Sequence, residues 1–427
     1  MMKISIMGGG YVGLPLAIKF SKFFQVYCYD TNKYRIEKLN KGLDFNKQHS
    51  KKELLSKNLI FTNEIQDLKN SNFYIVTVPT PIDKQNQPVL SYLESATINL
   101  AKIINKGSYI IYESTTYPGC TDEFCVPILK KYSKLKYNKD FFVAYSPERV
   151  NPGDKINTLN TITKIIGSNN PSVTNKVKKL YSKICKNLHI VNSIKIAEFA
   201  KIIENVQRDV NIALINELSV LFHKFNVPTN EILKAAATKW NFHYYKPGLV
   251  GGHCISVDPH YLSYKAEQKN YFPKLILSGR RFNESMGRYV AIQTAKLISK
   301  RNINISKARI AILGFTFKEN VPDLRNTKII QIVDEMKKRK SQVKVFDPIV
   351  SKKEAMKIYN IKIYRPSELK KFKFDAIIFA VSHKVFIKKL SYYNQFYKDK
   401  NNKILIDIKN NYLQKNLDLE KYNYFQL

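Results

Sequence analysis

One cysteine in this sequence is set apart by the residues around it. Cys254 lies in GLVGGHCISVDPHYL, residues 248–262, with three glycines before it and Asp258 after it. A structural cysteine behaves as a small apolar side chain and needs no glycines beside it. Three interpretations compete: a structural loop, a metal site made of His253, Cys254, Asp258 and His260, or a thiolate nucleophile that a substrate can approach closely.

A lysine and an asparagine offer the chemistry that such a nucleophile would use. Lys201 and Asn205 are four residues apart in an apolar-periodic segment, residues 195–225, so they share one face of a predicted helix. Both can hold an oxyanion, and a cation near a thiol lowers its pKa. With a hydride acceptor, this set favours aldehyde oxidation through a thioester that water opens. A solvated pair on a helix surface is the alternative.

The N-terminal segment has the spacing of a dinucleotide-binding turn. Residues 3–30 predict a strand, a glycine turn, a helix and a second strand that ends at Asp30. Gly8, Gly10 and Gly13 would provide the tight turn, the close approach to a pyrophosphate and the packing of helix against strand. A carboxylate at Asp30 binds ribose hydroxyls and repels a 2′-phosphate, which favours NAD over NADP. A glycine-rich turn without a ligand is the alternative.

Three more apolar segments extend this pattern into a parallel sheet. Strands are expected within residues 72–81, 107–116 and 141–149. The carboxyl ends of parallel strands face the ligand crevice of an open sheet. The side chains expected to line one cleft are therefore Thr80, Ser114, Thr115 and Glu148.

The last third of the chain repeats this order of elements. Residues 309–348 predict strand, turn, helix and strand with Asp347 at the strand end, and another strand follows in residues 374–382. The full glycine spacing is missing, so a different nucleotide is expected here. The predicted fold is α/β: two Rossmann-like, doubly wound parallel-sheet domains joined by a helical region with a long central helix.

Composition limits the class of protein. With 427 residues, 44% of them hydrophobic, the chain can form two or three packed domains. No apolar segment approaches the roughly 20 residues that cross a bilayer, and the five cysteines form no CxxC pair. We therefore expect a reduced protein in the cytoplasm, without a membrane partner. The charge of +37 is spread along the chain, which does not favour nucleic acid as a partner. The long helix offers a self-complementary face, so a homodimer is expected.

Taken together, the motifs resemble the UDP-glucose/GDP-mannose dehydrogenase superfamily along nearly the whole chain. The resemblance is greatest to the bacterial UDP-N-acetylhexosamine 6-dehydrogenases of polysaccharide and Vi-antigen biosynthesis. The segments that carry it are GGGYVGLPLA, VTVPTPID, YESTTYPGCT, AYSPERVNPGD, KIIENVQRDVNIALINE, KWNF, PGLVGGHCISVDPHYL, GRRFNESM and GFTFKENVPDLRNT. The resemblance implies oxidation of C6 of the sugar from alcohol to acid, in two hydride transfers to NAD.

The resemblance also implies domains and residue roles. Residues 1–190 would bind NAD, residues 191–300 would carry the bridging helix and the cysteine loop, and residues 301–427 would bind the UDP-sugar. The catalytic set, in which Asp258 orients water and Glu148 is the base for thioester hydrolysis, is Cys254, Lys201, Asn205, Asp258, Glu148 and Thr115. The cofactor set is Gly8, Gly10, Tyr11, Val12, Gly13, Asp30, Arg35, Thr80, Ser114, Thr115 and Arg325. The substrate set is Glu148, Arg149, Val150, Lys201, Asn205, Gly251 and Lys318. No metal is expected.

Departures from the UDP-glucose enzymes concern the sugar. Where those enzymes carry PEFxxE and GGSCxxKD, this chain has Pro152 in place of a glutamate, His253 in place of a serine and Val257 in place of a lysine. The changed pocket favours UDP-GlcNAc or UDP-GalNAc over UDP-ManNAc, with UDP-glucose last. Two rival functions are a two-electron oxidoreductase or epimerase, which would not use Cys254, and a nucleotide-sugar-binding protein without turnover.

Overall fold

The computed structural model describes the chain except residues 1, 45–47, 151–155, 389, 415–418 and 420–421. Pro152, one of the expected departures in the sugar pocket, lies outside the described residues. The chain folds into two compact units. Unit 1 contains Met1–Asn205 and His260–Phe272, and unit 2 contains Val206–Pro259 and Pro273–Leu427.

Unit 1 is built on an eight-stranded sheet with the order β3-β2-β1-β4-β5-β6-β7-β8. All neighbouring strands are parallel except β6 and β7. The strands are β1 Lys3–Met7, β2 Gln25–Tyr29, β3 Leu59–Thr62, β4 Phe73–Val76, β5 Ser108–Tyr112, β6 Phe141–Tyr145, β7 Thr163–Gly167 and β8 Asn187–Val191. The expected strands correspond to β4, β5 and β6, but each ends before the polar residues that follow its apolar core.

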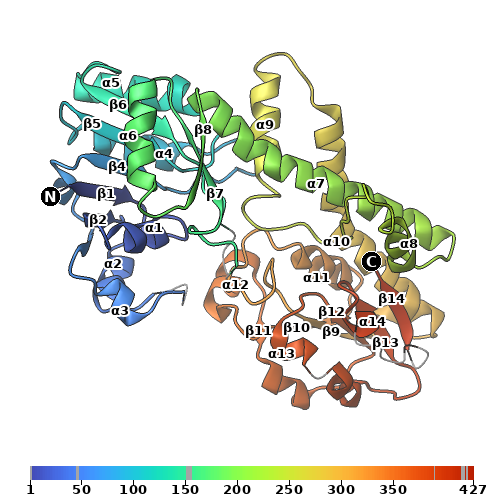
Figure 1. Ribbon diagram of the computed structural model, residues 1–427. Coiled ribbons are helices and arrows are strands. Elements are labelled where there is room, and N and C mark those ends of the chain that lie inside the picture. The colour runs from blue at the N-terminus through green and yellow to red at the C-terminus, as the bar shows by residue number, and fades with distance from the viewer. Residues whose placement is uncertain (1, 45–47, 151–155, 389, 415–418, 420–421) are drawn as a thin grey trace. The chain divides into compact units, whose positions relative to one another are not determined.

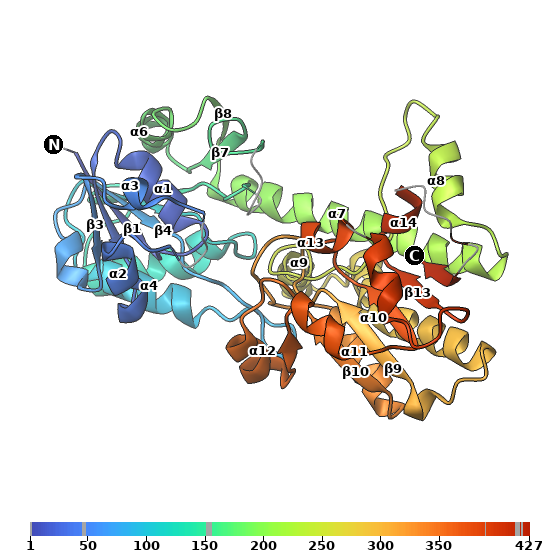
Figure 2. The same ribbon diagram turned by 90° about the horizontal axis from the view of Figure 1, so that it is seen from below.

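Helices cover both faces of this sheet, as Figures 1 and 2 show. Central strands such as β4 are buried along their whole length, as is typical of parallel sheets with two covered faces. On one face, α1 and α6 share a single apolar core with the strands. The helices are α1 Gly13–Phe20, α2 Lys33–Asn40, α3 Lys51–Leu54, α4 Ser91–Ala101, α5 Val126–Ser133 and α6 Pro171–Tyr181.

Unit 2 contains a second, six-stranded sheet with the order β11-β10-β9-β12-β13-β14, in which every neighbouring pair is parallel. Its strands are β9 Arg309–Leu313, β10 Gln342–Phe346, β11 Ile363–Tyr364, β12 Ala376–Phe379, β13 Ile404–Asp407 and β14 Asn423–Gln426. Its helices are α8 Thr229–Ala236, α10 Lys274–Lys300, α11 Ile329–Lys338, α12 Lys352–Tyr359, α13 Lys384–Ile387 and α14 Asn411–Gln414. The strand, helix and strand expected in residues 309–348 are β9, α11 and β10.

Two helices run from one unit into the other. The long helix α7, Ile194–Lys224, leaves unit 1 after Asn205 and continues in unit 2 (Figure 1). Helix α9, Asp258–Glu267, begins in unit 2 and continues in unit 1. The predicted fold class, two parallel-sheet α/β domains with a long central helix, is confirmed. Within the described ranges, no helix is long and apolar enough to span a membrane.

Candidate functional site

The glycine turn after β1 has the shape that the sequence predicts. Gly8 has a φ of +110°, and a Cβ there would lie 2.9 Å from the Thr77 carbonyl oxygen. A Cβ at Gly13 would collide with the Gly8 carbonyl oxygen, so the start of α1 can pack this closely only without a side chain. A Cβ at Gly10 would meet no atom within 4 Å. The turn therefore leaves open space at Gly10, where the sequence predicts a pyrophosphate, between two positions at which the fold requires glycine.

Asp30 lies beside this turn, directly after β2. Its Oδ2 accepts the Gly9 backbone N–H at 3.0 Å and an Arg35 guanidinium N–H at 2.7 Å. Its Oδ1 accepts the Asn32 N–H at 2.9 Å, while the Asn32 side chain caps α2. The expected cofactor residues Asp30 and Arg35 thus form an ion pair next to the turn. A glycine turn with a strand-end carboxylate fits a dinucleotide with two ribose hydroxyls.

The ends of β4 and β5 bring further expected residues together in unit 1. The Thr80 hydroxyl donates to the Thr115 carbonyl oxygen at 2.5 Å, and the Ser114 hydroxyl donates to the Val78 carbonyl oxygen at 2.7 Å. The Tyr261 hydroxyl of α9 donates to the Thr80 carbonyl oxygen. These contacts hold the two strand ends against each other.

Glu148 and Arg149 follow β6 and do not pair with each other through their side chains. Glu148 Oε1 accepts the backbone N–H of Arg149 at 2.6 Å and that of Val150. The Arg149 guanidinium instead lies 2.8 Å from Glu204 of α7 and donates to the Thr163 carbonyl oxygen at 2.6 Å. The Glu148 carboxylate is therefore oriented by backbone donors, and Arg149 connects this segment to α7.

The first half of α7 carries Lys201 and Asn205 and also a glutamate that the sequence analysis missed. Lys201 is buried, and Asn205 is half-buried. Glu198 is fully buried and accepts the Gly119 N–H at 2.5 Å, the Thr121 N–H at 3.0 Å and the Thr121 hydroxyl at 2.7 Å. Burial raises the pKa of Glu198 to about 7, against the effect of these donors. The signal that could have indicated Glu198 in the sequence is a single acidic residue among the apolar residues of IKIAEFA.

The Cys254 loop is a tight turn that leads into α9. Cys254 is half-buried, and its carbonyl oxygen accepts the N–H groups of Val257 at 2.9 Å and Asp258 at 2.8 Å. Asp258 is buried at the start of α9. A Cβ at Gly251 would lie 2.6 Å from the Asn326 carbonyl oxygen, and one at Gly252 would lie 2.8 Å from the Phe317 ring. A Cβ at either position would collide with a neighbouring segment of unit 2, and the expectation that these glycines admit substrate stays a prediction.

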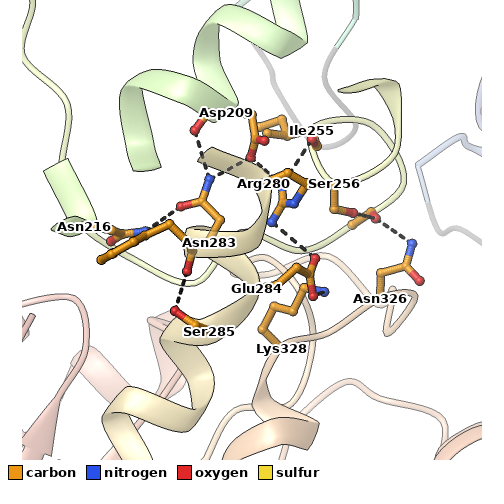
Figure 3. A network of polar contacts seen from close by, with 12 residues as sticks. Asp209, Asn216, Ile255, Ser256, Arg280, Asn283, Glu284, Ser285, Asn326 and Lys328 are labelled. Carbon is orange, nitrogen blue, oxygen red and sulfur yellow. Dashed lines mark hydrogen bonds and ion pairs between the residues drawn. The ribbon is translucent and has the colours of Figure 1, made fainter. Parts of the chain in front are cut away.

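A buried polar network in unit 2 holds this loop, as Figure 3 shows. Arg280 of α10 pairs with Asp209 of α7 and reaches the Ile255 carbonyl oxygen at 3.5 Å, one residue after Cys254. Asn283 donates to Asp209 Oδ1 at 2.8 Å. Asn283 also accepts from Asn216, which in turn pairs with the backbone of Gly248, the first residue of the GLVGGHC segment. Helices α7 and α10 are therefore bonded to the loop at two points.

Arg325 and Lys318 lie in the segment that packs on the loop. The Arg325 guanidinium pairs with Asp323 at 2.5 Å and lies 3.2 Å from His253 Nδ1. Burial alone would raise the pKa of Asp323, but the hydrogen bonds and charge of Arg325 outweigh it, so the pKa is lowered. Lys318 is half-buried, and its carbonyl oxygen accepts the Thr316 hydroxyl at 2.7 Å. Arg325, expected to contact the cofactor, thus lies beside the residue that precedes Cys254.

Unit 2 also places a lysine near Gly248 that the sequence analysis missed. Lys409 follows β13, and its Nζ would lie 3.0 Å from a Cβ on Gly248. The side chain of Lys409 is exposed, and charged groups near it are Glu319, Lys246 and Arg208. The rule that ligands bind at the carboxyl ends of strands was the signal that could have found it.

The carboxylate at the end of β10, Asp347, lies beside a histidine, whereas Asp30 pairs with an arginine. Asp347 is fully buried and accepts the N–H groups of Phe315 at 2.8 Å, Ile349 at 2.9 Å and Val350 at 2.8 Å. His383 Nε2 lies 3.1 Å from its Oδ2. Burial alone would raise the pKa of Asp347, but His383 and the backbone donors outweigh it, so the pKa is lowered.

The expected site residues are divided between the two units. Unit 1 contains the glycine turn, Asp30, Arg35, the strand ends at Thr80 and Thr115, Glu148, Arg149, Lys201 and Asn205. Unit 2 gathers Gly251, Cys254, Asp258, Lys318 and Arg325. Among the residues with described positions, no three His, Cys, Asp or Glu side chains come together as a metal ion would require, so the metal interpretation of the Cys254 loop has no support.

Comparison with known proteins covers nearly the whole chain. Three models of the UDP-glucose/GDP-mannose dehydrogenase family match it: the NAD binding domain over residues 2–185, the central domain over residues 195–285 and the UDP binding domain over residues 311–414. Two relatives, from Salmonella typhi and Pseudomonas aeruginosa, are named UDP-N-acetyl-D-glucosamine 6-dehydrogenase. They are 48% and 49% identical to this chain, and each match covers 90% of this chain and 91% of the relative.

A solved structure agrees with this assignment. The UDP-D-ManNAc dehydrogenase from Pyrococcus horikoshii superimposes with a TM-score of 0.89 at 32% identity, over 100% of this chain and 99% of that one. The resemblance inferred from the motifs and the expectation of NAD as cofactor are both confirmed. The chain therefore belongs to the UDP-glucose/GDP-mannose dehydrogenase family, and it is an NAD-dependent dehydrogenase with an N-terminal NAD binding domain and a C-terminal UDP binding domain.

Proposed function

We propose that this protein is a UDP-N-acetylhexosamine 6-dehydrogenase that oxidises C6 of UDP-GlcNAc or UDP-GalNAc to a carboxylate for surface polysaccharide synthesis. The observation that carries the proposal is the match to two UDP-N-acetyl-D-glucosamine 6-dehydrogenases over nine-tenths of the chain. The half-buried Cys254, in a loop braced by Arg280 and Asn216, supports it because a nucleophile must be both reachable and fixed.

In this proposal the first oxidation produces an aldehyde at C6. NAD, when bound at the glycine turn, accepts one hydride in each of the two oxidations. The C6 hydroxyl loses its proton to a base, a role that Asp258 shares with Lys201, and Lys201 and Asn205 stabilise the C6 oxyanion from which the hydride leaves. Tyr11, Val12 and Arg35 complete the cofactor set, with Arg35 held by Asp30.

The second oxidation uses the thiolate of Cys254. Its sulfur bonds to the aldehyde carbon, Lys201 and Asn205 hold the resulting oxyanion, and loss of hydride leaves a thioester. Glu148 takes a proton from water as that water attacks the thioester carbon, and Asp258 and Thr115 orient the water. The C–S bond then breaks, which returns the thiolate and releases the uronic acid.

We also propose that the protein is a homodimer formed through α7. One helical turn takes 3.6 residues, so Ile196, Phe199, Ile203, Leu214 and Leu221 fall on one stripe of the helix. These side chains are between 40% and 53% exposed. Exposed apolar residues along one face of a helix are typical of a self-complementary interface.

The test of the activity is the amount of NADH formed per UDP-sugar consumed. We expect two NADH for each UDP-GlcNAc or UDP-GalNAc, less activity with UDP-ManNAc and least with UDP-glucose. One NADH per sugar would instead indicate a two-electron oxidoreductase, and sugar binding without NADH would indicate a binding protein. Either result would contradict the proposal.

The variant Cys254→Ser tests the nucleophile. We expect turnover to fall at least about 10³-fold with an unchanged circular dichroism spectrum, because the hydroxyl is a far weaker nucleophile. Cys185→Ser is the matched control: burial raises the pKa of the Cys185 thiol to about 11, so that cysteine is an inert thiol at neutral pH. A Cys254→Ser enzyme that still made uronic acid at near wild-type rate would show that the nucleophile is assigned wrongly.

A further inference from the structure

A surface cavity in unit 2 lies at the edge of the sheet where the strands begin. Arg309 is the first residue of β9, Gln342 is the first residue of β10, and Phe374 comes two residues before β12. These strands are neighbours, in the order β10-β9-β12. The cavity has a volume of about 410 Å³, which is in the size range of small-molecule sites. Its lining residues are Arg309, Gln342, Lys344, Lys370, Lys371, Phe372, Lys373 and Phe374.

The lining is much more basic than the chain as a whole. Five of its eight residues are lysine or arginine, whereas 71 of all 427 residues are. At the frequency of the whole chain, about one residue in eight positions would be a cation. Within the described ranges, no aspartate or glutamate lines the cavity. The lysine-rich composition of the protein therefore does not account for this concentration of positive charge.

Two acids adjoin the lining residues in the sequence, and both have other partners. Glu368 is near enough to Lys371 to feel its charge, but its carboxylate pairs with Lys352 at 3.1 Å and accepts the Arg365 N–H at 2.6 Å. Asp375 Oδ2 accepts the backbone N–H of Arg309 at 2.8 Å, which leaves the guanidinium out of this contact. The cations of the lining thus face one another without a carboxylate between them.

Lys344 brings one of these charges onto the face of the sheet. It is half-buried on β10, and its ammonium lies 4.4 Å from the centre of the Phe372 ring and 5.1 Å from that of the Tyr364 ring. Such cation–π contacts are attractive, but they do not neutralise the charge. An anion in the cavity would reduce the repulsion between Lys344 and the other cations.

Hydrogen bonds fix the lining on two sides. The Arg309 carbonyl oxygen accepts the Asp375 N–H at 2.8 Å, and the Phe374 N–H donates to the Phe396 carbonyl oxygen at 2.8 Å. The Lys373 ammonium donates to the carbonyl oxygen of Gln395. The framework of the cavity is therefore formed before a ligand arrives, which lowers the entropic cost of binding.

We propose that this cavity binds an anion with two or more adjacent phosphate groups. Ammonium and guanidinium groups around one space match the charges of a phosphate chain, and the phenylalanine rings offer an apolar surface for the organic part of a nucleotide. This site goes beyond the proposed reaction. A UDP-sugar is expected at the carboxyl ends of the strands, and the five residues of β9 separate the two edges of the sheet by about 16 Å.

Calorimetric titration with tripolyphosphate tests the site, with UDP and NADH added to fill the nucleotide sites of the two domains. We expect one tripolyphosphate per chain, with the same affinity in the presence and absence of UDP. ATP that binds more tightly than tripolyphosphate would identify a nucleotide as the occupant, and equal affinities would identify the phosphate chain as the part recognised. Absence of binding, or displacement of tripolyphosphate by UDP, would overturn the proposal.

A triple variant removes three exposed charges of the lining: Lys370→Gln, Lys371→Gln, Lys373→Gln. We expect its affinity for tripolyphosphate to fall at least about 10-fold, because charge-assisted contacts are lost, with an unchanged circular dichroism spectrum. The matched control removes the same charge from exposed positions of α10 and α12 outside the lining: Lys296→Gln, Lys353→Gln, Lys357→Gln.

The control variant should keep nearly the wild-type affinity for tripolyphosphate. Equal losses in the two triple variants would indicate a general attraction of anions to a basic protein and would overturn the proposal. A single-stranded oligonucleotide that bound more tightly than tripolyphosphate would also overturn it, because a cavity of this size encloses a small ligand and not a polymer.

Lysine acetylation of the wild-type protein gives a readout that does not depend on how a variant folds. Tripolyphosphate should slow the reaction of acetic anhydride with Lys344, Lys370 and Lys371, measured by mass spectrometry, and should leave Lys296 and Lys353 unaffected. Equal protection of all five lysines, or of none, would contradict the site. Neither measurement uses turnover, so the result for this cavity is separate from the result for the proposed dehydrogenase reaction.

Discussion

At the scale of single residues, Glu198 is the side chain with the clearest dependence on pH. Its carboxylate binds the backbone and hydroxyl of the loop at Gly119 and Thr121 to α7, one turn before Lys201. Its folded-state pKa of about 7 exceeds the ordinary value of a glutamate. Between these two values the folded protein binds more protons than the unfolded chain, so stability falls as pH rises and the loss is complete above pH 7.

Glu198→Gln is expected to remove this dependence. The amide does not ionise, so the difference in unfolding free energy between wild type and variant should change by about 3 kcal/mol from pH 5 to pH 8, to the disadvantage of the wild type. Urea unfolding at several pH values measures it. Glu123→Gln, in the same region but at a half-exposed position, is the control. Parallel stability curves for wild type and Glu198→Gln would contradict this interpretation.

Residue identities could be predicted from sequence only where the pattern is local. Gly8, Gly13 and Asp30 lie within one strand-turn-helix-strand unit, so their spacing alone predicts their roles. Lys164 and Glu113 are 51 residues apart and meet only in the folded sheet, where β5 and β7 lie on either side of β6. A buried ion pair between such distant residues leaves no periodic signal in the sequence.

At the scale of elements, the position of the Cys254 loop depends on α7 and α10, two helices that lie outside the loop and its own helix α9 in the sequence. Arg280 of α10 and Asp209 of α7 form a buried ion pair that also reaches the loop at Ile255 (Figure 3). Breaking a buried pair leaves an uncompensated charge in the interior. The loop's geometry is thus coupled to the packing of α7 on α10.

Arg280→Met is expected to destabilise unit 2 and to release the loop. Loss of one partner of a buried pair costs about 3–5 kcal/mol of unfolding free energy, and kcat should fall more than KM rises because the nucleophile is displaced. Urea unfolding and the rate of Cys254 alkylation by iodoacetamide measure the two effects. Arg288→Met, on the same helix but at a largely exposed position, should change neither. Wild-type alkylation kinetics in a folded Arg280→Met protein would show that the network does not hold the loop.

Elements whose apolar residues recur with a clear period could be predicted from the sequence, whereas the strands β7 and β8 at one side of the first sheet could not. Helix α7 could be located because its apolar positions recur over 31 residues. Strands β7 and β8 were missed: β8 is mostly exposed, and β7 joins the sheet antiparallel to β6. The packing role of Gly251 and Gly252 could not be predicted from the local pattern, because the atoms that a Cβ would meet belong to Asn326 and Phe317, far along the chain.

At the scale of the whole molecule, the proposed dimer makes a mass prediction. We expect light scattering to give twice the chain mass of 49.6 kDa, and we expect the Ile203→Lys, Leu214→Lys double variant to give a single chain mass. Two buried charges would make the apolar stripe of α7 unable to pair. Ile358→Lys on α12, also an exposed apolar position, should leave the mass unchanged. A wild-type protein with the mass of one chain would contradict the dimer.

The division into three domains at residues 190 and 300 stays a prediction. The two compact units instead divide within α7, after Asn205, and exchange the segment His260–Phe272. A helix that belongs to both units carries no change in composition at the point of division, so sequence patterns could not locate it.

The two sheets carry the same signature, a carboxylate at the end of the second strand, but Asp30 keeps 7% of its surface exposed whereas Asp347 has none. In the second sheet, Asp347 has its oxygens filled by the chain itself, through Phe315, Ile349, Val350 and His383. A dinucleotide arriving there would find no acceptor for its ribose diol. Two similar folds in one chain can therefore bind different nucleotides without competing for the same molecule.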